Sequence, residues 1–179
     1  MCSSVRCVEC IVAVCLALAA GCNAEPTVTE NRPPLTVEGQ ELLNRLEGRW
    51  SLQVAVTGNC PSEWRRALPS GQAVFTVDGG VLQISALGSD MAEFTFFPVN
   101  ADTLMYSTTA SMAGCSLQES AEFVVESVGA SSAQGVMHVD LKRSNTPGCD
   151  ALLDDADLPE ACSTSTAFMG VRISMAPRR

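Results

Sequence analysis

From Gly48 onward, apolar residues recur at every second position, and this period restricts the fold more than any other feature of the sequence. Trp50, Leu52 and Val54 alternate with polar or small residues, and the same pattern returns in seven further segments. Because successive side chains of a strand point to opposite faces, such alternation is typical of antiparallel strands with one buried face. The eight predicted strands span residues 50–56, 71–77, 81–87, 91–99, 103–109, 117–127, 134–142 and 166–175.

The connections between these strands differ in length in a regular way. Residues 78–80, 100–102 and 129–131 are tight and contain Gly, Asn or Asp, which favour hairpin turns, whereas 59–70 and 144–163 are long. In an up-and-down meander alternate connections share one end, so one end should be trimmed and the other elaborated. We therefore expect an all-β, eight-stranded antiparallel up-and-down barrel, with a β-sandwich as the alternative.

The N-terminal region predicts export. Arg6, an apolar run over 10–20 and small residues before Cys22 are typical of a signal peptide, and the run is short for a membrane span. The sequence Leu18-Ala19-Ala20-Gly21-Cys22 resembles the lipobox of bacterial lipoproteins. That resemblance implies cleavage before Cys22 and attachment of acyl chains such as palmitate to it, and two or three chains anchor stably. In Gram-negative lipoproteins an Asp after the lipidated cysteine favours retention in the inner membrane; Asn23 stands there instead, so the resemblance implies the outer membrane, facing the periplasm or the surface.

Three regions follow from this reading: a signal peptide over 1–21, a lipidated tether over 22–35 and a β-barrel domain over 36–176. Thr36 is expected to cap a short helix over Val37–Leu46, with Leu42, Leu43 and Leu46 on one face.

Four cysteines remain for the exported domain: Cys60, Cys115, Cys149 and Cys162, all in connections of the elaborated end. Four cysteines in such a domain indicate two disulfides. Cys149 and Cys162 lie in one connection and are the easiest pair to join, which leaves Cys60 to Cys115. Because the connections that carry Cys60 and Cys115 are not neighbours around a barrel, Cys60 with one of the other two, and Cys115 with the remaining one, is the alternative.

The segment Leu46-Glu47-Gly48-Arg49-Trp50, after a short helix, resembles the Gly-x-Trp signature of the lipocalins. The resemblance implies that Trp50 plugs the closed end of the barrel and that Arg172, in the last strand, packs across its ring as a cation–π pair. The family's Thr-Asp-Tyr motif is absent, since residues 125–130 read Val-Glu-Ser-Val-Gly-Ala.

Composition and motifs argue against several kinds of chemistry. The formal net charge of −9 disfavours nucleic acid as a partner. His138 is the only histidine and is expected on a solvated face, so neither a metal site nor a catalytic triad is predicted. The acidic residues within 149–162 lack calcium-loop spacing. Glu119 shares a face with apolar residues and is expected to point inward near the rim. We expect no catalytic residues, no metal and no cofactor, and therefore no enzyme.

The sequence thus predicts a membrane-anchored barrel that binds a small apolar molecule, as a lipocalin-like carrier or storage protein. Trp64, in the 59–70 connection, is expected at the mouth as a lid or an anchor. The alternative is a protein-interaction or enzyme-inhibitor module that meets an envelope protein through its disulfide-braced rim. The predicted ligand-binding residues are Trp64, Phe75, Phe94, Phe96, Tyr106 and Phe123.

Overall fold

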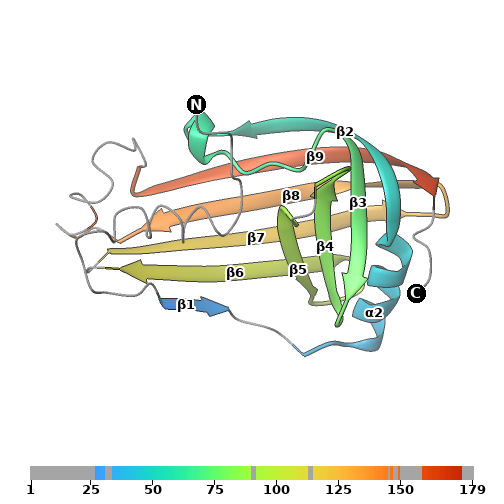
Figure 1. The fold of residues 1–179 in the computed structure, drawn as a ribbon, viewed down its shortest axis with the longest axis horizontal. Helices are drawn as coiled ribbons and strands as arrows, with labels where there is room; N and C mark the ends of the chain where they lie inside the picture. The colour runs from blue at the N-terminus through green and yellow to red at the C-terminus, as the bar shows by residue number, and fades with distance from the viewer. Residues whose placement is uncertain are drawn as a thin grey trace.

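The structure is a computed structural model, which describes residues 27–30, 34–89, 92–112, 115–144, 146, 149 and 159–174. Its centre is a closed, eight-stranded, antiparallel up-and-down barrel with one short helix before it (Figure 1). The predicted fold class is therefore confirmed, and the sandwich alternative is not needed. The predicted signal peptide and the predicted lipidation site, Cys22, lie outside the described residues.

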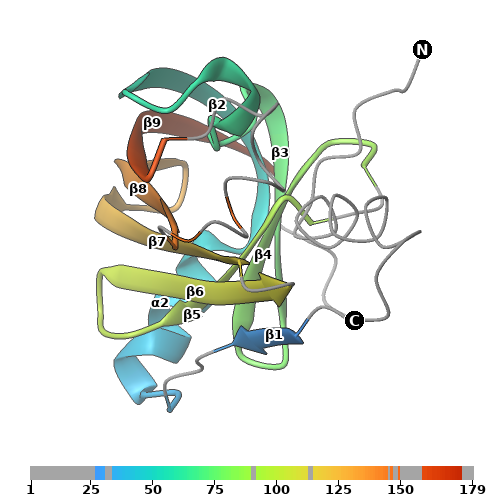
Figure 2. The ribbon, with the colours of Figure 1, turned by 90° about the vertical axis from the view of Figure 1, so that its left-hand side faces the viewer.

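The barrel is formed by β2 to β9, each paired antiparallel with the next along the chain, and β2 pairs with β9 to close the ring (Figure 2). Each predicted strand corresponds to an observed one, with ends that differ by a few residues. The elements are β1 (Thr27–Glu30), α2 (Val37–Leu46), β2 (Gly48–Gly58), η2 (Ser62–Trp64), β3 (Gly71–Asp78), β4 (Val81–Ala86), β5 (Phe94–Pro98), β6 (Thr103–Met112), β7 (Cys115–Val128), β8 (Ser132–Arg143) and β9 (Ala161–Ser174).

Helix α2 begins and ends as the sequence predicts. The Thr36 hydroxyl accepts a hydrogen bond from the Gly39 backbone N–H at 3.1 Å, which satisfies one of the otherwise unpaired amides of the first turn. Leu42, Leu43 and Leu46 are fully buried against the barrel. A Cβ on Gly39 would lie 2.8 Å from the Pro98 Cβ, so the glycine allows the helix to approach β5 closely. No helix among the described residues is both long and apolar enough to cross a bilayer.

The two ends of the barrel differ. The hairpins β3–β4, β5–β6 and β7–β8 turn at the end covered by α2, which we call the closed end (Figure 1). The connections β2–β3, β6–β7 and β8–β9 lie at the other end, which we call the open end; Figure 2 looks into it. The division of connections into a trimmed and an elaborated end is thus confirmed.

Residues 27–30 were predicted to belong to a tether outside the barrel, and this is wrong. They form β1, which pairs antiparallel with β6 from Thr27 opposite Ser111 to Glu30 opposite Thr108. The edge of β6 is available there because β5 pairs with β6 only through Phe97 and Pro98, nearer the closed end.

The apolar residues that alternate near the end of strand β9 face outward. Met169, Val171 and Ile173 are 61%, 63% and 51% exposed, whereas Gly170 is buried. A Cβ at Gly170 would lie 2.9 Å from the Leu52 Cδ2 and 3.3 Å from the Trp50 Cε3. The inward face therefore needs a glycine to make room for Trp50, and the apolar alternation faces outward. Met175 lies outside the described residues.

Candidate binding site in the open half of the barrel

The closed end is sealed by Trp50 and Arg172. Trp50 is fully buried, and its Nε1–H donates a hydrogen bond to the Leu46 carbonyl at 2.7 Å. The Arg172 guanidinium lies 4.5 Å from the centre of the Trp50 ring and donates to the Arg45 carbonyl. Both bonds satisfy carbonyls of the last turn of α2, where a positive charge also suits the helix dipole. The structure thus places this pair as the lipocalin resemblance implies.

Burial lowers the pKa of Arg172 because desolvation disfavours the charged guanidinium. An arginine begins so far above neutrality that the side chain stays protonated at physiological pH. The cation needed to stack on Trp50 is therefore present throughout the physiological range.

Above this seal the interior is packed with contacting aromatic rings. Phe75 lies 6.1 Å from Trp50 and 6.4 Å from Phe123, measured between ring centres. Phe123 in turn lies 5.0 Å from Phe168 and 5.4 Å from Phe96. These rings come from different walls of the barrel and meet in its middle, so the half nearest α2 is filled by its own side chains.

The open half has a different lining. Going outward along β9, Phe168 is followed on the inward face by Thr166 and Thr164, which are 0% and 1% exposed. Neither threonine hydroxyl has a hydrogen-bond partner in the described part of the chain. A buried, unsatisfied hydroxyl costs about 1–3 kcal/mol, so two in adjacent inward positions call for a physical reason.

Glu119 lies on β7, two strands from β9 in the ring, and the strand register through Leu141 places it level with Cys162. It is 2% exposed and stands opposite Thr108 on β6 and Leu141 on β8, both of which are also buried. The expectation that Glu119 points inward is confirmed. It lies four residues below Cys115, inside the open half and below the rim on which it was expected.

Arg66, from the β2–β3 connection, reaches down to Glu119. Its Nε lies 3.3 Å from Glu119 Oε1, and its Nη2 donates to the Glu93 carbonyl at 3.0 Å. Its guanidinium also lies 4.9 Å from the centre of the Phe94 ring. Leu68 of the same connection is buried in the main core. This connection therefore folds into the mouth, with a charged pair beneath it.

The disulfides brace the open end with a pairing that differs from the preferred prediction. Cys60 is bonded to Cys162, and Cys115 to Cys149, with Cα separations of 4.8 Å and 4.4 Å. The predicted Cys149–Cys162 and Cys60–Cys115 pairs are therefore wrong, and the alternative is confirmed. Strands β2 and β9 are neighbours in the ring, as are β7 and β8, so each bond joins adjacent walls instead of spanning the mouth.

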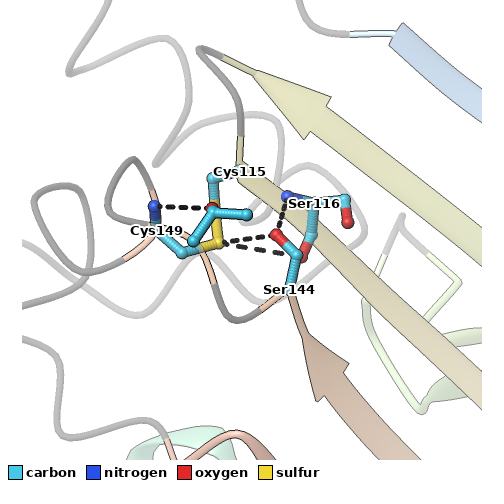
Figure 3. Close-up of a disulfide and its surroundings, with 5 residues drawn as sticks. Cys115, Ser116, Ser144 and Cys149 are labelled. Atoms are coloured by element: carbon cyan, nitrogen blue, oxygen red, sulfur yellow. Dashed lines mark hydrogen bonds between the residues drawn. A yellow bond between two sulfur atoms is a disulfide. The ribbon is translucent and has the colours of Figure 1, made fainter.

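The Cys115–Cys149 bond is surrounded by hydrogen bonds (Figure 3). The Ser116 N–H donates to Ser144 Oγ at 2.9 Å. Ser144 Oγ lies 3.1 Å from Cys149 Sγ and acts as the donor, because a disulfide sulfur carries no hydrogen. The start of β7 and the end of β8 are thus joined by covalent and polar contacts.

The predicted ligand-binding residues divide into two groups. Phe75, Phe94, Phe96, Tyr106 and Phe123 are all buried in one core cluster and point into the barrel. Trp64 is half-buried and packs on a second cluster of Cys60, Leu117, Leu141 and Cys162 at the rim. The first group forms the floor of the open half, and Trp64 covers the Cys60–Cys162 bridge.

Sequence reasoning missed Arg66, Thr164 and Thr166. Thr164 and Thr166 do share the period of Phe168, which was a usable signal, but threonine is equally at home on a solvated strand face. No pattern in a connection predicts that Arg66 turns inward. His138 is exposed, as expected, and its Nδ1 lies 2.7 Å from Ser165 Oγ.

Most of the acidic segment within 149–162 lies outside the described residues. Among those that are described, no three His, Cys, Asp or Glu side chains gather as metal ligands would.

A search of protein-family models, of curated proteins and of solved structures found no match to this chain. Its function is therefore inferred from its own residues.

Proposed function

We propose that this protein is a lipid-anchored protein of the bacterial cell envelope that binds one small, largely apolar molecule in the open half of its barrel. The observation that supports this proposal most directly is that the Thr164 and Thr166 hydroxyls are buried without a hydrogen-bond partner in the described part of the chain. They lie next to the aromatic rings in the middle of the barrel. A ligand with an apolar body and at least one polar group would cover the rings and hydrogen-bond these hydroxyls. Lipid anchoring is supported by the lipobox at Cys22.

Arg66 and Glu119 fit this proposal as the outer boundary of the site. Their charges compensate one another, so the pair places no net charge beside a bound apolar molecule. The Arg66 side chain is the more exposed partner, at 20% against 3% for Glu119. For a ligand to enter, the 59–70 connection, which carries Arg66, then has to move. The strands of the barrel wall can stay in place.

Titration of the full chain with a fluorescent long-chain fatty acid tests the proposal, because that probe combines an apolar chain with one polar end. We expect saturable binding with one equivalent. Thr164→Val together with Thr166→Val should weaken it about tenfold, since two hydrogen bonds of about 0.5–1.5 kcal/mol each are lost. Thr57→Val, on the exposed outer face of β2, is the matched control. Absence of saturable binding to a folded wild type would contradict the proposal.

The second candidate is a protein-interaction or inhibitor module acting through the rim. It is favoured by the two disulfides and the half-buried Trp64, which together hold a rigid surface at the open end. This candidate requires no small ligand. Organic extraction of the purified protein followed by mass spectrometry separates the two, because only a carrier should release a stoichiometric small molecule.

A further inference from the structure

Strand β1 fixes where the N-terminal segment leaves the barrel. It lies along the open-end half of β6, with Thr27 opposite Ser111, one residue before β6 ends at Met112 (Figure 1). From there the chain runs toward α2 at the closed end. Everything before Thr27 therefore begins at the mouth, beside the β6–β7 connection.

The distance from Cys22 to this point is short. A chain extends by at most about 3.6 Å per residue, so the five steps along the chain from Cys22 to Thr27 reach no farther than about 18 Å. Along β6, the eight steps from Ser111 to Thr103 span about 26 Å at 3.3 Å per residue. The anchored cysteine can thus lie above the open end or beside the upper wall, but it cannot reach the turns of the closed end.

We propose that the lipid anchor holds this barrel with its open end toward the bilayer, so that the mouth faces the lipid surface at close range. The inference rests on the proposed lipid anchor and adds the orientation and the source of the ligand. A site that opens onto a bilayer within this range is placed to exchange an amphiphile with it.

Charge alone would not produce this orientation. With a formal net charge of −9, the chain is repelled by an anionic membrane surface. At the open end the described cations Arg65, Arg66, Lys142 and Arg143 are accompanied by Glu63, Glu93, Glu119 and Glu160, so the described part of the mouth carries no one-sided basic patch. The hydrogen bonds of β1 to β6 and the short link to Cys22 would have to hold the mouth in place.

The two tryptophans can report on the orientation as energy-transfer donors, so the protein itself needs no added label. Trp64 lies at the open end and Trp50 at the closed end, and the sequence has no others. The lipidated full chain is placed on phosphatidylethanolamine/phosphatidylglycerol vesicles that contain a dansyl-labelled lipid headgroup, and energy transfer from tryptophan is measured. Transfer should fall at least about twofold in Trp64→Phe, because the remaining Trp50 lies farther away by most of the length of the barrel, roughly 26 Å.

A second variant tests the part played by β1. Replacement of Thr27–Glu30 by Gly-Ser-Gly-Ser keeps the length of the link and the lipid, but weakens strand pairing. We compare the energy transfer of this variant with and without Trp64→Phe. The difference should be smaller than the difference between the wild type and Trp64→Phe.

The outcomes separate the two proposals. Aqueous partitioning of the wild type in a detergent phase separation would overturn both the anchor and the orientation. Detergent-phase partitioning together with equal or greater transfer in Trp64→Phe would overturn the orientation alone. A Gly-Ser variant that retains the full difference would show that β1 does not set the orientation.

Discussion

At the scale of single residues, Trp50 and Arg172 show how two side chains connect a helix to a sheet. The indole bonds the last carbonyl of α2, and the guanidinium covers the indole while bonding the carbonyl before it. Because the helix end and the barrel floor share these contacts, removal of either side chain exposes polar groups as well as apolar area.

Trp50→Ala should lower the free energy of unfolding by about 3–5 kcal/mol, as for other large aromatic residues removed from a core. Arg172→Met, which keeps the length but loses the charge, should lower it by about 1–2 kcal/mol through the lost cation–π contact and hydrogen bond. Urea unfolding followed by circular dichroism, with the disulfides intact, measures both values. An effect of Arg172→Met below 0.3 kcal/mol, smaller than an ordinary cation–π pair of about 0.5–1 kcal/mol, would argue against the pairing.

Thr166→Val, in contrast to the Trp50 and Arg172 substitutions, should raise the free energy of unfolding. Valine has nearly the same shape and removes a buried hydroxyl without a partner, so the ligand-free protein should gain about 1 kcal/mol. The same substitution should weaken ligand binding, which gives opposite signs for stability and function. If Thr166→Val instead lowers stability, as the replacement of a hydrogen-bonded threonine does, the Thr166 hydroxyl already has a hydrogen-bond partner.

Arg66 and Glu119 are best tested together. Arg66→Met leaves the 2%-exposed Glu119 without its ion-pair partner and should destabilise by about 1–3 kcal/mol, since Arg66 is itself partly exposed. Arg66→Met with Glu119→Leu should recover most of that loss, because no buried charge remains. A double-mutant cycle in the same unfolding assay gives the coupling energy, and additive losses would show that the pair does not interact.

At the scale of elements, the strands could be predicted from periodicity and α2 from its cap. The cysteine pairing between neighbouring strands could not. The disulfide prediction took the two cysteines closest in sequence, but proximity in a barrel depends on which strands are neighbours in the ring. The inward face of β9 cannot be identified from apolar side chains near its end, because the inward residue beside Trp50 is Gly170, which has none. Strand β1 was missed because Thr27-Val28-Thr29-Glu30 contains a single apolar residue and so gives no alternation.

The two disulfides should contribute unequally. In the chain-entropy model, the bond between Cys60 and Cys162, with a sequence separation of 102, is worth about 4.7 kcal/mol. The bond between Cys115 and Cys149, with a separation of 34, is worth about 3.8 kcal/mol. Paired Cys→Ala variants compared by thermal unfolding should rank in that order. The reverse order would mean that local contacts, such as those of Ser144, outweigh the entropy of the unfolded chain.

At the scale of the whole molecule, the barrel was predictable, and the division of its interior was not. Apolar alternation identifies the inward residues of most strands, although not of β9, and the depth at which rings meet depends on strand register. An aromatic closed half and an open half that contains buried polar groups therefore become visible only once Phe123, Phe168 and Thr166 are placed relative to one another.

Cys22→Ser tests how the molecule is held in the envelope. The serine hydroxyl does not replace the thiol as acyl acceptor, so the variant should move from the detergent phase to the aqueous phase or remain unprocessed. Cys7→Ser, within the predicted signal peptide, is the matched control and should partition like the wild type. Equal partitioning of wild type and Cys22→Ser would contradict lipidation at this residue.

The bond between Cys60 and Cys162 joins the first barrel strand region to the last, and thereby turns the chain between them into a covalent ring. Strands β3 to β8 lie wholly within that ring, while β2 and β9 form its seam. A single proteolytic cut in any turn of the ring, for example at Gly79–Gly80, leaves one covalently connected molecule with every strand still in register. After a cut outside residues 115–149, where the Cys115–Cys149 bond cannot hold the pieces together, survival of the barrel as one molecule should therefore depend on the redox state of this one bond.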